Sequence, residues 1–241
     1  MVSRVRRILG TRKVGHTGTL DPFATGVLPV AVNDGTKAIP FLDEGIKCYE
    51  AVMRLGVTTD TLDITGTVQT ETDSTSVGLE QLIEALSGFT GSISQTPPMF
   101  SAIKQNGQPL YKLARKGIEV ERKARQVEII ALDLLSFTPP YASIRVTCSR
   151  GTYVRSLADD IGAKLGCGAV LQDLRRTVSG PFTIGLAVSL EKLEDTAREG
   201  RLKTLFLSPY AALGHLADIE LDDAACGKVR HGQSPAVQDL Q

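Results

Sequence analysis

Two well-separated segments of the chain alternate between hydrophobic and polar side chains, and this pattern constrains the fold more than any other. In KCYEAVMRLGV (47–57) and ASIRVTCS (142–149), every second residue is apolar. Successive side chains point to opposite faces of a β-strand, so each segment predicts a strand with one apolar face. The residues expected on these faces are Tyr49, Ala51, Met53 and Leu55 in the first segment, and Ala142, Ile144, Val146 and Cys148 in the second.

Helical periodicity alternates with further strand patterns along the chain, which predicts an α+β fold. Apolar residues recur at helical spacing in segments that end at glycines or follow a capping serine. The expected helices cover 2–9, 79–87, 154–165 and 190–199, and further strands are expected at 26–32, 127–137 and 169–180.

The composition is that of a soluble globular protein. Of the 241 residues, 42% are hydrophobic and 22% are charged, and the length suits one large domain with or without a small appendage. No apolar run approaches the roughly 18 residues of a membrane span. Charges at the N-terminus disfavour a signal peptide. The four cysteines form no CxxC pair and there are three histidines, so we expect no metal site and a reducing cytoplasm.

The formal charge is zero, but the charges are unevenly distributed. Residues 1–20 contain five basic residues and no acid, and residues 101–126 contain seven basic residues and two acids. A third basic stretch covers 145–176. Each run alone is typical of a solvated face. Convergence of the runs would create an anion-binding surface, and we expect Arg4–Lys13, the 104–125 run and Arg175-Arg176 to line one side of a common cleft.

The segment KVGHTGTLDPFATGVL (13–28) is the densest candidate for chemistry. Asp21 precedes a proline, which keeps it out of the helical region and projects a carboxylate from a loop. An Asp before proline is also a common turn former. A catalytic carboxylate would need a partner that orients it.

Arg155 is a candidate partner for that carboxylate. It lies in the first turn of its expected helix, where the helix dipole disfavours a cation. A two-pronged pair with a loop carboxylate would explain this position and would lower the pKa of the carboxylate. Alternatively, Arg155 is solvated and the small cost is tolerated. Tyr49 and Tyr153 are either core aromatics or side chains that stack on an extruded base.

Residues 97–126 form a basic excursion, which we expect to be mobile and to carry function. The chain lacks GxxxxGK[ST], GxGxxG, HExxH and GxSxG. Nucleotide hydrolysis, a dinucleotide cofactor, metalloprotease activity and serine-hydrolase activity are therefore not indicated.

Five stretches in order resemble the TruB-type tRNA pseudouridine synthases. GHTGTLDPFATGVLP resembles the active-site motif of that family and KCYEAVMRLGVTTDTLDITG its second motif. The resemblance continues through the excursion and the third active-site stretch. These later matches are PPMFSAIKQNGQPLYKLARKG (97–117), SRGTYVRSLADDIG (149–162) and LRRTVSGPF (174–182).

The resemblance implies a pseudouridine-synthase fold, with a mixed, mostly antiparallel central sheet, flanking helices and an RNA-gripping insertion. It implies isomerisation of the T-loop uridine at tRNA position 55 to pseudouridine, without cofactor or metal. Asp21 would be the nucleophile and Arg155 its ion-pair partner. The remaining implied roles are Tyr49 in stacking and proton removal at C5, Tyr153 and Leu174 as pocket walls, His16 as a wedge in the T-loop, and Lys104, Lys112 and Arg115 as phosphate contacts.

Two other functions are consistent with the same residues. A non-catalytic protein could grip or fold the T-arm with the same cleft, and a nucleoside hydrolase would release free uracil. The expected partner is the T-arm of tRNA, with no membrane or protein partner and a monomeric state.

The resemblance also sets expectations for domain organisation. We expect a catalytic domain over 1–208, with its insertion at about 97–126, and an incomplete PUA-type RNA-binding domain over 209–241. Family members begin with an Asp-Lys-Pro strand ahead of the opening helix. Met1 falls within that region, so we expect this strand to be missing and a sheet edge to be exposed.

Overall fold

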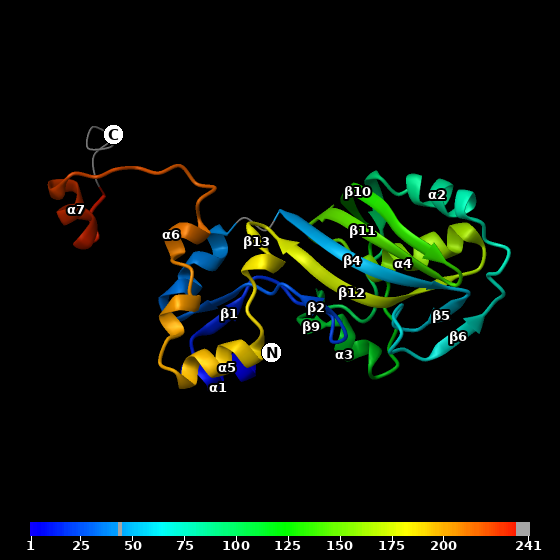
Figure 1. Cartoon of the computed structure of the whole chain (residues 1–241), viewed down its shortest axis with the longest axis horizontal. Helices are drawn as coiled ribbons and strands as arrows, with labels where there is room; N and C mark the ends of the chain where they lie inside the picture. Colours follow the sequence, from blue (N-terminus) through cyan, green and yellow to red (C-terminus); the bar gives the residue numbers. More distant parts are fainter. Residues whose placement is uncertain (43–44, 235–241) are drawn as a thin grey trace. The chain divides into compact units, whose positions relative to one another are not determined.

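The computed structural model describes residues 1–42 and 45–234 (Figure 1). The chain divides into two compact units, Met1–Phe206 and Leu207–Gln241. In the second unit, α6 (Pro209–Ala212) and α7 (Asp223–Arg230) begin at the capping side chains of Ser208 and Asp222. Its assignment to a PUA-type domain stays a prediction, and its last seven residues, 235–241, lie outside the described residues.

The first unit is built on a mixed, mostly antiparallel sheet of seven strands, which confirms the predicted fold class. The strand order is β13-β12-β4-β11-β10-β7, and short β2 runs parallel to β12. These strands are β2 (Thr25–Gly26), β4 (Ile46–Leu55), β7 (Gly91–Gln95), β10 (Arg125–Thr138), β11 (Tyr141–Ser149), β12 (Ala169–Ser179) and β13 (Phe182–Thr183).

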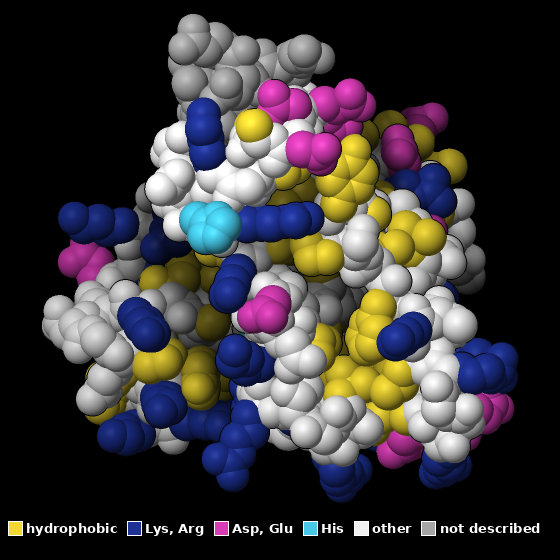
Figure 2. All heavy atoms as spheres, turned by 90° about the vertical axis from the view of Figure 1, so that its left-hand side faces the viewer, with side chains coloured by type: hydrophobic (Ala, Val, Ile, Leu, Met, Phe, Trp, Pro, Cys, Tyr) yellow, Lys and Arg dark blue, Asp and Glu magenta, His cyan; other side chains and the backbone are white. Residues whose placement is uncertain are grey.

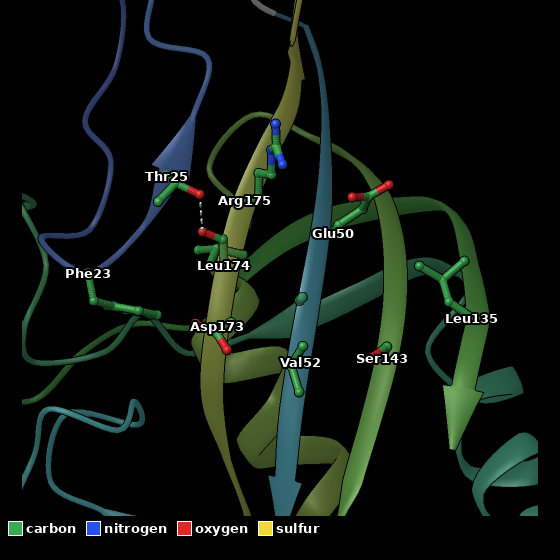
Figure 3. Close-up of a pocket in the computed structure, with 10 residues that line it drawn as sticks. Phe23, Thr25, Glu50, Val52, Leu135, Ser143, Asp173, Leu174 and Arg175 are labelled. Carbon is green, nitrogen blue, oxygen red and sulfur yellow. Dashed lines mark hydrogen bonds between the residues drawn. The ribbon is translucent and has the colours of Figure 1, made fainter. Parts of the chain in front are cut away.

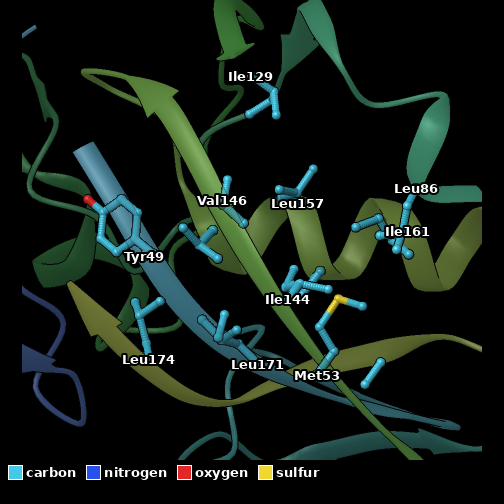
Figure 4. Close-up of a cluster of buried hydrophobic side chains, with 14 of the residues drawn as sticks. Tyr49, Met53, Leu86, Ile129, Ile144, Val146, Leu157, Ile161, Leu171 and Leu174 are labelled. Atoms are coloured by element: carbon cyan, nitrogen blue, oxygen red, sulfur yellow. The ribbon is translucent and has the colours of Figure 1, made fainter. Parts of the chain in front are cut away.

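Helices α2 (Leu79–Ser87) and α4 (Val154–Leu165) pack against one face of this sheet. Figure 4 shows α4 lying across the strands with its apolar side chains turned toward them. Residues of β4 alternate between buried and partly exposed, as predicted, because every second side chain enters the core with α4. Tyr49 and Leu174 lie at one end of this core in Figure 4.

The N-terminal region forms a separate small assembly. The predicted opening helix is α1 (Val2–Leu9), which ends at Gly10 in the left-handed conformation. It packs against α5 (Leu190–Arg198), whose first turn is capped by Ser189 as predicted. Strands β1 (Val14–His16) and β3 (Val30–Val32) pair antiparallel and flank the loop that carries Asp21. The predicted strand at 26–32 is too long, because regular pairing covers only 30–32 there and Gly26 belongs to β2.

The basic excursion contains regular structure. β8 (Lys104–Gln105) and β9 (Gln108–Pro109) form a hairpin across Asn106-Gly107, and α3 (Leu110–Ala114) follows directly. Both turn residues have positive φ, as a tight hairpin turn requires. A second hairpin joins β5 (Val57–Thr59) to β6 (Val68–Glu71). Short 3-10 helices cover 33–41, 184–186 and 202–205.

Candidate active site

Asp21 and Arg155 form the two-pronged ion pair that the sequence predicts. The Arg155 guanidinium donates from Nε to Asp21 Oδ2 at 2.8 Å and from Nη2 to Oδ1 at 2.7 Å. The Asp21 side chain is 28% exposed, whereas that of Arg155 is 3% exposed. The carboxylate therefore faces outward from a buried guanidinium. The ion pairs of Arg155 offset the unfavourable interaction of its charge with the helix dipole in the first turn of α4.

A second carboxylate holds Arg155 from the other side. Asp63 is 4% exposed, and its Oδ2 lies 3.4 Å from Arg155 Nη1. Asp63 Oδ1 accepts hydrogen bonds from Thr61 and Thr65. Arg155 also donates to the carbonyls of Thr61 and Phe100, at 2.9 and 2.8 Å. Every edge of the guanidinium is thus occupied, so its orientation is fixed.

The ion pair with Arg155 lowers the Asp21 pKa as predicted, but the net shift of this pKa is upward. Burial raises the pKa of the Asp21 carboxyl above its usual range, and the nearby Asp63 carboxylate adds to the rise. Arg155 opposes both effects without reversing them. The expectation considered only the ion pair and left out the loss of solvent around the carboxylate and the second negative charge.

Two tyrosines lie close to Asp21. Burial raises the pKa of both the Tyr49 and the Tyr153 phenol, and the negative charge of Asp21 adds to both rises. Tyr153 precedes α4, and its backbone is held on both sides by the Gln95 side chain, at 2.7 and 3.1 Å. Tyr49 and Leu174 are 9% and 7% exposed and belong to one hydrophobic cluster. Both tyrosines are therefore fixed walls beside the carboxylate.

The other predicted site residues stand apart from this cluster. His16 donates from Nδ1 to the Gly18 carbonyl at 2.8 Å, which fixes its ring on the Asp21 loop. Lys104, Lys112 and Arg115 are exposed on the insertion, and Arg115 stacks over the Tyr111 ring. Within residues 1–42 and 45–234, no hydrogen bond or ion pair joins these three cations to Asp21. Their link to the site is the insertion itself, whose Phe100 carbonyl accepts from Arg155.

The expectation that all basic stretches line one side of the cleft is wrong in part. Arg4 forms ion pairs with Glu191 and Glu194 on α5, so its charge is already compensated. Arg175 pairs in register with Glu50 on the sheet face turned away from α4, where Figure 3 shows both side chains. Arg176, its neighbour, is 3% exposed.

Lys and Arg side chains are nevertheless scattered over the face seen in Figure 2, among hydrophobic and uncharged groups. Consecutive strand residues point to opposite faces, so one Arg pair cannot serve a single surface. The basic stretches therefore supply surface charge without forming one continuous strip beside Asp21.

A cavity of about 350 Å³ lies on the outer sheet face, and its lining includes Leu174 but none of Asp21, Tyr49, Tyr153 and Arg155 (Figure 3). Phe23 and Leu174 form its apolar wall, and Glu50, Asp173 and Arg175 its polar wall. Within residues 1–42 and 45–234, no group of three or more His, Cys, Asp or Glu could hold a metal ion. Among the same residues, no helix is long and apolar enough to cross a membrane.

Asp63, Arg176 and Gln95 were not predicted as site residues. The cluster of Thr and Asp in TTDTLDITG was the available signal for Asp63, because such residues bond to one another in tight turns. Alternation in the predicted strand 169–180 places Arg175 and Arg176 on opposite faces, but it does not indicate that the face with Arg176 closes over its guanidinium.

Two protein-family models match consecutive parts of this chain. Residues 6–154 match the model of the TruB family pseudouridylate synthase N-terminal domain, and residues 155–213 match that of the tRNA pseudouridylate synthase B C-terminal domain. The chain is 56% identical to tRNA pseudouridine synthase B of Geotalea uraniireducens, covering all of this chain and 78% of that protein. It is 49% identical to the protein of the same name from Pseudomonas aeruginosa, covering 96% of this chain and 77% of that protein.

A solved structure also matches the fold of this chain, at lower sequence identity. A chain in the crystal structure of a Cbf5-Nop10-Gar1 complex matches with a TM-score of 0.75 and 30% identity. The match covers 99% of this chain and 64% of that chain. The family models together cover most of the sequence, including every residue of the Asp21 cluster. The chain therefore belongs to the TruB family of pseudouridylate synthases.

Proposed function

We propose that the chain isomerises the T-loop uridine of tRNA to pseudouridine, with Asp21 as the nucleophile. As a family member at about half identity to several tRNA pseudouridine synthases, it is an isomerase that acts on tRNA. The observation that carries the residue assignment is the geometry of Asp21: a partly exposed carboxylate fixed on a guanidinium that is itself buried. Substrate can reach the carboxylate, whereas Arg155 only orients it.

The reaction breaks the bond between N1 and C1′, turns the uracil in its pocket and joins C5 to C1′. Asp21 can attack C1′, add to C6 of the base, or assist loss of the ribose 2′ proton. In each case the reacting oxygen needs a free lone pair. Each Asp21 oxygen accepts one hydrogen bond from Arg155, and the carboxylate retains lone pairs on its exposed side.

The detached uracil must stay in the pocket until C5 is in place. Tyr49 and Leu174 are rigid parts of the core, and Tyr153 is held by Gln95. Stacking on these side chains retains the base and excludes water. Extrusion of the uridine costs a few kcal/mol in a duplex and less in an irregular loop. His16 is the proposed wedge that keeps the uridine extruded.

The exposed cations of the insertion supply phosphate contacts. Lys104 lies on the hairpin, Lys112 on α3 and Arg115 directly after it, and none of the three forms an ion pair within the described part of the chain. Phosphate contacts give affinity without sequence reading, which suits recognition of the T-arm by shape. A monomeric state, a cytoplasmic location and a PUA-type second unit stay predictions.

Asp21→Asn tests the proposed function. The amide retains the shape of the side chain but lacks its charge and nucleophilicity. We expect release of tritium from tRNA carrying 5-tritiated uridine to be abolished, while filter binding of tRNA stays near normal. Asp34→Asn, on an exposed acid, is the matched control.

Two outcomes would contradict the proposal. Unchanged turnover by Asp21→Asn would remove Asp21 as the nucleophile. Free uracil as the product of the parent protein, instead of a C-glycoside, would identify a hydrolase.

A further inference from the structure

Arg176 is a buried cation that has no assigned role in the reaction proposed above. It lies on β12, directly paired with Tyr49 of β4, on the sheet face that α4 covers. Its guanidinium donates from Nε to the Val27 carbonyl at 2.8 Å and from Nη1 to the Thr19 carbonyl at 3.3 Å. These two carbonyls lie on either side of Asp21 in the sequence, so Arg176 holds both arms of the Asp21 loop.

The charge of Arg176 lacks compensation in the described residues. At 3% exposure it forms no ion pair there, and its buried Nη2 makes no hydrogen bond of normal geometry. Arg155, buried to the same extent, contacts two carboxylates. An unpaired buried cation is costly, and a buried donor without an acceptor requires an explanation. A phosphate of the RNA is a poor candidate acceptor, because Arg176 is almost inaccessible.

The ionisable neighbour of Arg176 across the strand pair is Tyr49. Burial raises the pKa of the Tyr49 phenol, and Arg176 is the principal group that opposes this rise. The other ionisable groups that face the phenol are Cys148 on β11 and Asp21, and both add to the rise. Arg176 is thus the cation placed to stabilise a negative charge on Tyr49.

The proposed reaction includes a step in which such a charge develops. Isomerisation transfers one hydrogen overall from C5 to N1 of the base. In a balanced route, the Tyr49 phenol gives its proton to N1 of the detached uracil anion. In the route where Asp21 has attacked C1′, C5 then bonds to C1′ as the bond from C1′ to the Asp21 oxygen breaks and its electron pair returns to the carboxylate. The C5–H bond breaks next, its proton returns to the Tyr49 oxygen, and its electron pair restores the C5–C6 double bond. Between these transfers Tyr49 is a phenolate.

We propose that Arg176 is a positioning residue that stabilises the Tyr49 phenolate through its free Nη2 while its other nitrogens hold the Asp21 loop. The inference rests on the proposed function, because it assigns Tyr49 to proton transfer at C5. The same guanidinium then couples the loop that carries the nucleophile to the group that moves the proton.

Titration of Tyr49 in the absence of RNA tests whether Arg176 stabilises the Tyr49 phenolate, independently of turnover. The chain has five tyrosines, so the tyrosinate absorbance of the parent minus that of Tyr49→Phe isolates Tyr49. In Arg176→Gln, measured against its own Tyr49→Phe double variant, we expect Tyr49 to ionise at higher pH. Arg175→Gln, on the adjacent residue and the opposite sheet face, should leave the titration unchanged. An unchanged titration in Arg176→Gln would overturn the proposal.

Chemical rescue separates this role from simple support of the loop. We expect Arg176→Gln to lower the single-turnover rate by about 100-fold, the order found when one donor to a developing anion is removed. Incorporation of 2,3-difluorotyrosine at position 49, whose phenol is more acidic, should recover at least about tenfold of that loss. Failure of rescue together with an unshifted titration would leave Arg176 as a loop clamp only.

Arg176→Lys covers the case in which the Gln variant does not fold. A single ammonium cannot hold both loop carbonyls and also reach the phenol, so Tyr49 should again ionise at higher pH than in the parent. Equal titration in this variant would contradict the proposal. If Asp21→Asn retained turnover, the assignment of Asp21 as the nucleophile would fail, but the titration would still measure the coupling between Arg176 and Tyr49.

Discussion

The Arg155 guanidinium lies between two carboxylates, with Asp21 held at 2.7 and 2.8 Å and Asp63 at 3.4 Å. The two acids differ in exposure. Asp63 is 4% exposed, while the Asp21 side chain is 28% exposed. One cation therefore holds a buried carboxylate on one side and a partly exposed carboxylate on the other. This arrangement gives the Asp21 carboxylate a fixed direction without enclosing it.

Removal of Arg155 should affect stability as well as turnover. In Arg155→Ala two largely buried carboxylates lose their cation, and breaking a buried pair in this way typically costs about 3 kcal/mol or more. We expect urea denaturation to show a loss of that order. Arg155→Lys should lose less stability, because a positive charge remains, but it should still lose turnover, because an ammonium cannot make the two parallel bonds.

Arg150→Ala, which removes an exposed arginine shortly before α4, is the control for Arg155. Equal stability of Arg155→Ala and Arg150→Ala would show that the ion pairs contribute nothing to folding.

Charge reversal on the insertion should weaken tRNA binding in a salt-dependent way. We expect the triple change of Lys104, Lys112 and Arg115 to Glu to lower affinity at low salt and to flatten the dependence of log affinity on log salt. Each lost phosphate contact reduces that slope by about 0.7 to 0.9. Filter binding across a salt series measures both quantities.

A double reversal of Lys192 and Lys203, exposed residues of α5 and the following 3-10 helix, is the matched control. Parallel salt slopes for the insertion variant and the parent would contradict phosphate contact by the insertion.

A methyl group at Gly26 should disrupt the pairing of β2 with β12, which holds the end of the Asp21 loop. Gly26 has a φ of 97°, and a Cβ there would lie 2.1 Å from the Arg176 carbonyl on the paired strand. Because the carbonyl oxygen belongs to the backbone of β12 and the Cβ is bonded directly to the backbone of β2, the clash is relieved only by separating β2 from β12. We expect Gly26→Ala to cost about 2 kcal/mol or more in unfolding free energy and to lower turnover.

Gly18→Ala, on the same loop, has nothing within 4 Å of its added Cβ and should be tolerated. Similar stabilities for the two glycine variants would show that the contact between Gly26 and β12 is not required.

The sequence predicts the parts of this site that depend on local pattern. Alternation places Tyr49 on the core face of β4, and the unfavourable dipole position of Arg155 indicates an anionic partner. The predictions fail where tertiary contacts decide. Asp63 reaches Arg155 only because the segment after β5 folds against β12, and this contact has no local signal. Arg176 is buried because the Asp21 loop packs over β12 and its Val27 and Thr19 carbonyls accept hydrogen bonds from the guanidinium. This long-range contact has no local sequence signal.

The pH dependence of turnover should reflect the raised pKa of Asp21. Nucleophilic attack requires the ionised carboxylate, so single-turnover rates should fall on acidification. The fall should occur at a higher pH than the value of about 3.9 typical of an aspartic acid, because burial and Asp63 favour the protonated form. Asp63→Asn removes one of these causes and should shift the acid limb to lower pH. If the acid limb of the pH–rate profile did not move in Asp63→Asn, Asp63 would not influence the Asp21 pKa.

Stability should change with pH in the opposite sense. A carboxyl whose pKa is higher in the folded than in the unfolded state binds its proton more tightly when folded. Its contribution to stability is full below the unfolded pKa and is lost as pH rises through the folded pKa. Asp21→Asn lacks this titration, so its stability relative to the parent should increase as pH rises through that window. Urea denaturation of both proteins across acidic to neutral pH measures the difference. A difference that stays constant, or that decreases with rising pH, would mean that the Asp21 pKa is not raised in the folded protein.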